Sequence, residues 1–169
     1  LCRVLDVLGA EGDDGKPPAV VLKGADLATT LYPSLALRPM CDLDLLVPRS
    51  RFHEALQKLA LLGYERASPE LATGHDELTG HAVTLLGGPR RKVAVELHWG
   101  LISSEHDWRS PELEWFWEQC ERWSRPQGAG GTDSDPSWKV SLPESFFHLR
   151  PTAQLLYLAA HLMFQHQGA

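Results

Sequence analysis

Two short segments place three carboxylates at alternating positions of predicted strands. Residues 41–47 carry Asp42 and Asp44, and residues 93–99 carry Glu96. Because side chains of an extended chain alternate between two faces, Asp42 and Asp44 share one face, roughly 7 Å apart, while the leucines face the core. If the two strands are neighbours, Glu96 joins the aspartates. Like charges on one face repel, and a divalent cation is the usual remedy. Acids on a solvent-facing strand are ordinary, however, so this pattern alone does not favour a metal site; the segment upstream of it does.

A second feature, upstream of the acids, indicates a phosphate site. Residues 19–22 form a short apolar run that ends at Lys23-Gly24, and residues 25–31 have a helical pattern. A strand, a glycine turn and a helix start can hold a phosphate, because free backbone N–H groups favour an anion and glycine lets it approach. The patterns Gly-x4-Gly-Lys-Ser/Thr and Gly-x-Gly-x-x-Gly are absent, so a P-loop and a dinucleotide fold lose support.

These features occur together in a known order. The glycine turn at Gly24, the Asp42-x-Asp44 pair and the later Glu96 resemble the polymerase-beta-like nucleotidyltransferase superfamily. Within it, the sequence is similar to the uncharacterised bacterial nucleotidyltransferase family, most closely over residues 1–100. The motifs that carry this resemblance are Leu22-Lys-Gly-Ala25, Leu31-Tyr-Pro33, Leu37-Arg-Pro-Met40, Asp42-Leu-Asp-Leu-Leu-Val47 and Glu96-Leu-His-Trp99.

The resemblance implies an α/β (α+β) fold: a small mixed β-sheet with helices packed on it and a helical C-terminal part. It implies a metal-dependent nucleotidyltransferase that moves a nucleoside monophosphate from an NTP to an unknown acceptor, with release of pyrophosphate. Asp42, Asp44 and Glu96 would be the catalytic residues and the ligands of two Mg²⁺ (or Mn²⁺) ions.

The expected nucleotide-binding residues are Lys23, Gly24, Ala25 and Arg38. Lys23 supplies a point charge and Arg38 a planar fork for a phosphate. Alternatively, Lys23 is a solvated turn residue and Arg38 pairs with an aspartate. Ala25 stands where the superfamily commonly has Ser, which keeps open a nucleotide-binding or interaction domain without turnover. A metal-dependent phosphohydrolase is a third possibility.

Histidines are numerous, but their spacing does not indicate zinc. His161 and His166 are five residues apart, which separates them by about 140° around a helix. His98 shares the strand face of Glu96 and is therefore a possible substrate contact. The alternative is a histidine that is hydrogen-bonded in the core.

Composition limits the partners. The net charge is −6 and no Lys/Arg run occurs, so no surface for duplex nucleic acid is evident. Three cysteines without a Cys-x-x-Cys pair favour free thiols and a cytoplasmic location, and Cys41 is expected to be buried. No apolar run is long enough to span a membrane. The resemblance implies an NTP and its acceptor as partners. Because the chain begins within an amphipathic run, we also expect the rest of a longer parent chain as a partner.

The chain is expected to divide into three parts. Residues 1–123 form the catalytic domain, with a helix over residues 51–62 that Ser50 caps, a hairpin of strands 82–86 and 92–97, and a last helix with an apolar stripe from Leu113 to Trp123. Residues 124–137 are a flexible loop or linker. Residues 138–169 begin a helical C-terminal region, in which residues 151–165 form a helix that is apolar on most sides and therefore buried.

Overall fold

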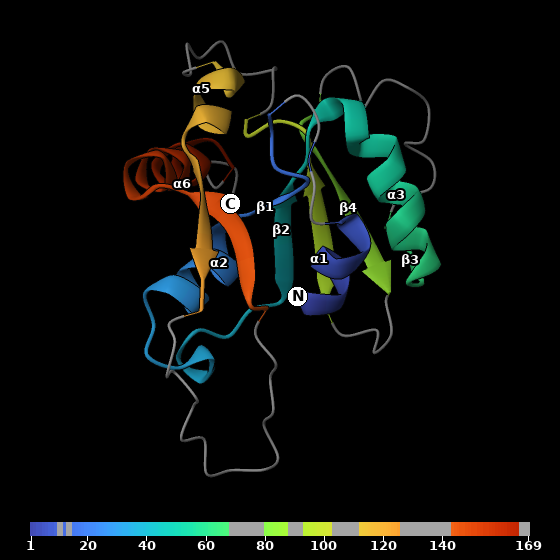
Figure 1. Ribbon diagram of the computed structural model, residues 1–169, viewed down its shortest axis with the longest axis horizontal. Coiled ribbons are helices and arrows are strands. Elements are labelled where there is room, and N and C mark those ends of the chain that lie inside the picture. Colours follow the sequence, from blue (N-terminus) through green and yellow to red (C-terminus); the bar gives the residue numbers. More distant parts are fainter. Residues whose placement is uncertain are drawn as a thin grey trace.

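A seven-stranded mixed sheet organises the protein. The computed structural model describes residues 1–9, 12, 15–67, 80–87, 93–102, 112–125 and 143–165. In this part of the chain the strand order is β3-β4-β5-β2-β1-β7-β6 (Figure 1). The strands are β1 (Val20–Val21), β2 (Asp42–Leu46), β3 (Tyr64–Arg66), β4 (Ala82–Gly87), β5 (Ala94–His98), β6 (Cys120–Ser124) and β7 (Ser145–Leu149). The α-helices are α1 (Cys2–Leu8), α2 (Lys23–Thr30), α3 (Phe52–Leu61), α5 (Leu113–Glu118) and α6 (Pro151–Gln165).

The two acidic strands are neighbours at the centre of the sheet. β2 runs parallel to β5, and Asp44 pairs with Glu96 in register. β4 and β5 form the expected antiparallel hairpin, whose connection lies outside the described residues. β1 is antiparallel to β2 and parallel to β7. The predicted fold class, a mixed sheet with helices packed on it, is therefore confirmed.

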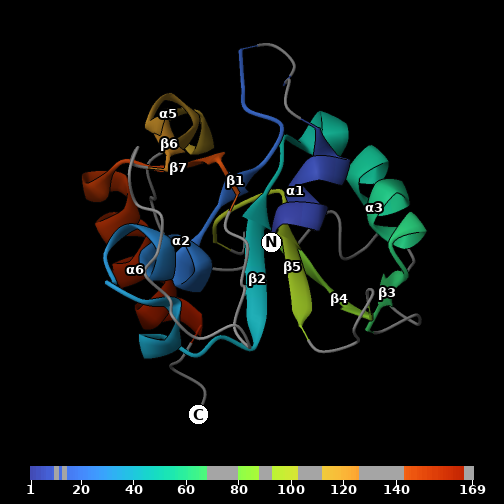
Figure 2. The same cartoon turned by 60° about the horizontal axis from the view of Figure 1, so that its bottom comes forward.

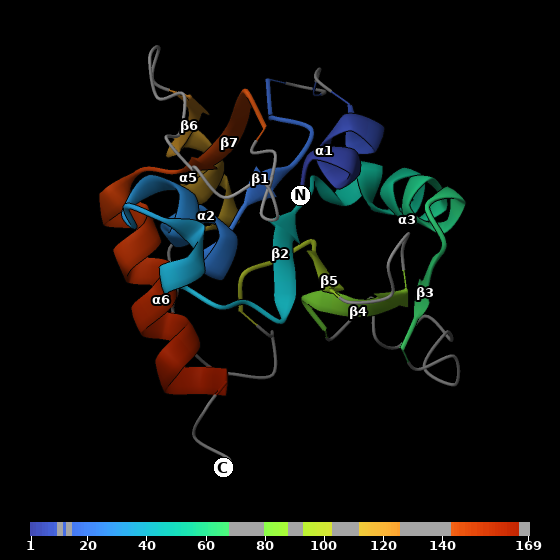
Figure 3. The same cartoon turned by 90° about the horizontal axis from the view of Figure 1, so that it is seen from below.

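Each face of the sheet has its own hydrophobic core. Leu43, Leu45 and Val47 pack with side chains of α1 and α3 on one face. Leu46 packs with side chains of α5 and α6, including Phe116 and Tyr157, on the other. Figures 2 and 3 show α1 and α3 together on one side of the molecule and α2, α5 and α6 on the other. Strand alternation therefore puts Asp44 and Glu96 on the α6 side.

The structure corrects the prediction for residues 113–123. Helix α5 ends at Glu118, and residues 120–124 form β6, which pairs antiparallel with β7. The apolar stripe that the sequence shows there is shared between a short helix and a strand, because the long-range pairing with β7 overrides a local helical pattern. β7 was not expected, and it places part of the C-terminal region inside the central sheet. The predicted linker lies outside the described residues beyond Arg125.

Helix α6 has the predicted bounds but not the predicted burial. It buries Ala153, Tyr157 and Ala160, whereas Leu155 and Leu162 are 70% and 66% exposed. The helix is thus amphipathic in its packing rather than enclosed. In the described part of the chain, each helix is too short or too polar to cross a membrane.

Two smaller expectations also need correction. The N-cap of α3 is Arg51 and not Ser50, because a 3₁₀ turn over Arg49–Arg51 leads into the helix without a side-chain cap. All three cysteines have free thiols, as expected, but Cys41 is exposed instead of buried.

Gly63 and Gly87 provide a test of the sheet edge. Gly63 ends α3 at φ 82°, as its position after the helix predicts, and a Cβ added there would meet open space. Gly87 has φ 123°, and a Cβ there would lie 2.3 Å from the carbonyl oxygen of Gly63. We expect Gly63→Ala to cost about 1 kcal/mol of backbone strain and Gly87→Ala clearly more, because β4 must also move away from β3. Urea unfolding of the two variants measures the difference; equal losses would contradict this packing.

Candidate active site

The site is built around Asp44, a carboxylate that the sheet buries. Asp44 is 3% exposed. Glu96 pairs with Asp44 between β2 and β5, and its side chain is 32% exposed. A buried carboxylate is costly unless hydrogen bonds and opposite charges compensate it. The surroundings of Asp44 therefore determine what this cluster can do.

Lys23 supplies the compensating positive charge. Its Nζ lies 2.7 Å from Oδ1 of Asp44 and 3.5 Å from Oε2 of Glu96. The backbone brings the lysine there, because the N–H of Leu22 donates to the carbonyl oxygen of Asp44 and α2 starts at the next residue. Lys23 adopts φ 45°, which is uncommon for a residue with a side chain and stores local strain. The ion pairs hold this conformation in place, so Lys23 is not a solvated turn residue.

His98 is the third member of the cluster. Its Nε2 lies 3.1 Å from Oδ1 of Asp44 and 3.5 Å from Oε2 of Glu96. Both neighbours are hydrogen-bond acceptors, so these contacts assign the proton to Nε2, which donates to Asp44. The residue is 1% exposed and is thus hydrogen-bonded in the interior, beside the acids.

Asp44, Glu96 and His98 each offer one ligand atom within 4.8 Å of the others, a spacing that could hold a metal ion. Asp42 is not a member of this group. It is exposed at the start of β2, and partial burial with the negative charges of Asp44 and Glu96 raises its pKa. The hydrogen bond from His98 is the main cause that lowers the pKa of Glu96 to about 2, with the Lys23 charge acting in the same direction. Glu96 is therefore ionised at neutral pH.

The first turn of α2 adjoins the cluster. The N–H groups of the first helical residues have no partner within a helix, so those of Lys23, Gly24 and Ala25 are available to an anion. The positive φ belongs to Lys23 and not to Gly24, which corrects the expected glycine turn. A Cβ on Gly24 would lie 3.4 Å from the Met40 side chain. Ala25 is 5% exposed and its methyl group belongs to the core, which leaves only its main chain for a phosphate.

Arg38 lies apart from the acids in the described contacts. Its guanidinium carbon is 5.7 Å from the centre of the Tyr32 ring, and its Nε is buried without a hydrogen-bond partner among the described residues. Among the described residues, these contacts include no ion pair between Arg38 and an aspartate. A phosphate role for this residue stays a prediction.

Helix α6 forms a wall of the site that the sequence did not predict. Tyr157 lies with its ring centre 6.0 Å from Nζ of Lys23, and burial with the charges of Asp44 and Glu96 raises the pKa of its hydroxyl. His81 at the start of the hairpin is also close, with its ring centre 5.7 Å from that of His98. Burial lowers the pKa of His81 to about 4, so its ring is neutral. In the sequence, Tyr157 differs from its neighbours only by a polar hydroxyl group within a predicted apolar helix, and this did not identify it as a site residue.

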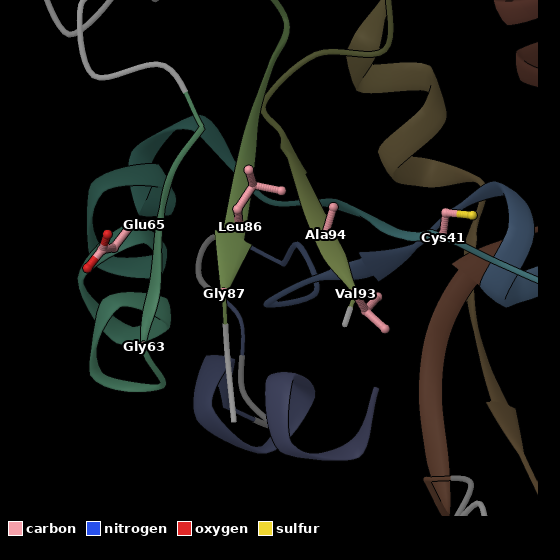
Figure 4. A pocket seen from close by; sticks show the side chains of 7 residues that line it. All are labelled: Cys41, Gly63, Glu65, Leu86, Gly87, Val93 and Ala94. Atoms are coloured by element: carbon pink, nitrogen blue, oxygen red, sulfur yellow. The ribbon is translucent and has the colours of Figure 1, made fainter. Parts of the chain in front are cut away.

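A cavity of about 570 Å³ lies at the end of the sheet near Asp42. Figure 4 shows Glu65 on β3 and Leu86 on β4, Ala94 at the start of β5 with Val93 just before it, and Cys41 ahead of β2. Ala94 pairs with Asp42 in the β2–β5 register, so the cavity begins beside the first aspartate. Gly63 and Gly87 complete its lining.

A mixed sheet with paired acids on two central strands, beside a helix start that carries a lysine, defines a nucleotidyltransferase type of core. A family model described as an uncharacterised nucleotidyltransferase matches residues 13–169, and the chain belongs to that family. No curated protein and no solved structure matches the chain significantly. The family supports a general nucleotidyltransferase function.

Lys23→Met tests whether the lysine neutralises a buried charge. We expect this variant to lose about 3 kcal/mol of unfolding free energy in the presence of a chelator, because Asp44 remains buried with one partner fewer. Lys16→Met is the matched control. Its ion pair with Glu114 is equally short, 2.7 Å, but the Glu114 side chain is 61% exposed, so its loss costs about 1 kcal/mol or less. Similar losses in both variants would show that Lys23 is an ordinary surface cation.

Proposed function

We propose that this protein transfers a nucleoside monophosphate from an NTP to an acceptor hydroxyl or similar group, with release of pyrophosphate, and that Asp42, Asp44 and Glu96 carry the divalent metal this reaction uses. The observation that supports the proposal most is the placement of the Lys23 ammonium against Asp44 and Glu96 at the first turn of α2. A cation-binding cluster and an anion-binding helix start adjoin each other there. A metal-bound triphosphate needs both.

The residues present fit a metal ion. The carboxylates of Asp44 and Glu96 lie close together, and Lys23 shows that a cation is stable between them. Mg²⁺ and Mn²⁺ prefer carboxylate oxygens of this kind. When bound, the ion would neutralise phosphate charge and lower the pKa of the acceptor hydroxyl. Asp42, at the exposed end of the same strand, would complete the ligands toward solvent.

The protein groups have separable roles in this proposal. The N–H groups at the start of α2 would bind phosphate oxygens, and the Lys23 ammonium would pair with a phosphate once its carboxylate partners hold a metal. His98 holds Asp44 in place through its Nε2–H. The contribution of these groups is positioning and charge neutralisation, which the buried, low-dielectric setting of Asp44 strengthens.

The cavity beside Asp42 is proposed as the place of the acceptor. The cavity begins beside Asp42, the first acid of β2. Its lining combines the apolar side chains of Leu86 and Val93 with the carboxylate of Glu65. An acceptor with an apolar body and a hydrogen-bond donor or a positive charge would fit this lining. The chemical identity of the acceptor stays open.

A second candidate function is nucleotide binding without turnover. The observation that favours it is the burial of the Ala25 methyl group in the core, because this position then provides no side-chain contact to the phosphates. The two functions differ in one result. A binding domain takes up NTP and metal but releases no pyrophosphate.

Asp42→Asn and Asp44→Asn test the transfer reaction. With NTP, Mn²⁺ and a range of hydroxyl-bearing acceptors, we expect each variant to release pyrophosphate roughly 10²-fold more slowly than the unmodified protein, because a preorganised electrostatic contact is lost. Glu121→Gln is the control, since Glu121 is an acid on β6 that contacts Arg150 and His148 instead of the cluster. Pyrophosphate release at the normal rate in both aspartate variants would remove them from the mechanism.

A further inference from the structure

We propose that the hydroxyl of Tyr157 on α6 is a binding residue for a phosphate group of the metal-bound nucleotide. This inference rests on the proposed function and adds a residue that lies outside the acidic motifs. The residue sits on the side of the sheet that carries Asp44 and Glu96, where α6 packs over Leu46.

The hydroxyl is buried, and no described residue pairs with it. Tyr157 is 1% exposed, and its oxygen has no hydrogen-bond partner among the described residues. An unpaired buried hydroxyl is unfavourable, and such groups in native proteins call for a specific cause, such as a ligand that pairs with them. A phenylalanine would pack the same ring without that cost.

The position of Tyr157 indicates which ligand it would pair with. The negative charges of Asp44 and Glu96 act on the Tyr157 hydroxyl. Both carboxylates, however, already have Lys23 and His98 as partners. Burial, together with these two negative charges, raises the pKa of the hydroxyl, so it stays protonated and is a donor that needs an acceptor oxygen. The ammonium of Lys23, the first residue of α2, lies 6.0 Å from the ring centre. When Lys23 leaves Asp44 for a phosphate, the same phosphate comes within reach of the hydroxyl.

Gln154 supports the same assignment. It lies three residues before Tyr157, hence on the same side of α6, and is 5% exposed. Neither its Nε2 nor its Oε1 has a hydrogen-bond partner among the described residues. Two buried polar side chains on one strip of a largely apolar helix, both without a partner among the described residues, indicate a polar ligand beside that strip.

Tyr157→Phe separates a ligand contact from a structural one. The probe is inorganic tripolyphosphate with Mn²⁺, which requires no knowledge of the base, and the measurements are calorimetric titration and a melting curve of the free protein. We expect about tenfold or more weaker binding of tripolyphosphate, as for a lost hydrogen bond to a charged acceptor. The melting temperature of the free protein should stay the same or rise, because an unpaired buried hydroxyl is removed. Tyr64→Phe, in the core on the opposite face, is the control and should bind as the unmodified protein does.

The outcomes are distinct. Equal binding by Tyr157→Phe and the unmodified protein overturns the assignment of Tyr157 but leaves the proposed function intact. A lower melting temperature of the free variant also overturns it, because the hydroxyl then has a structural partner. If the unmodified protein binds no tripolyphosphate with Mn²⁺, the proposed function fails together with this inference. Weaker binding at undiminished stability supports it.

Discussion

Burial of the Asp44 carboxylate is the constraint on which the rest of the site depends. A charge taken out of water costs several kcal/mol unless good geometry compensates it. Lys23 and His98 both approach the same oxygen of Asp44, at 2.7 and 3.1 Å. Lys23 makes this contact from the first residue of α2, which starts directly after β1, and with a positive φ. The fold thereby joins a buried acid to the N-terminus of a helix.

The same arrangement keeps the acids stable in the free protein. Two carboxylates on adjacent strands repel each other, and the Lys23 ammonium compensates them. In the proposed function, a metal–nucleotide complex would bring a positive charge that replaces Lys23 at the acids and a phosphate that becomes the new partner of Lys23. The lysine would then couple metal binding to phosphate binding.

The sequence predicted what depends on local geometry and missed what depends on distant pairing. Alternation along residues 42–46 and 94–98 placed Asp44 and Glu96 on one face, and their neighbourhood in the sheet confirmed it. Lys23 was found because it follows a short apolar run and precedes a helical pattern, which are both local features of the sequence. β6 and β7 were missed because their partner strands lie far away in sequence, and Tyr157 because no local pattern tells which strand α6 covers. The acids and Lys23 could therefore be identified from the sequence, whereas the place of Tyr157 in the site became evident only from the tertiary packing.

The most direct test of the central claim is a crystal structure with Mn²⁺ and a non-hydrolysable NTP analogue, with the metal located by its anomalous scattering. The account predicts a Mn²⁺ peak bonded to Asp44 and Glu96, and the Nζ of Lys23 moved from Asp44 to a phosphate oxygen at the start of α2. A nucleotide bound elsewhere, with the 2.7 Å contact between Lys23 and Asp44 unchanged and no metal at the carboxylates, would contradict it.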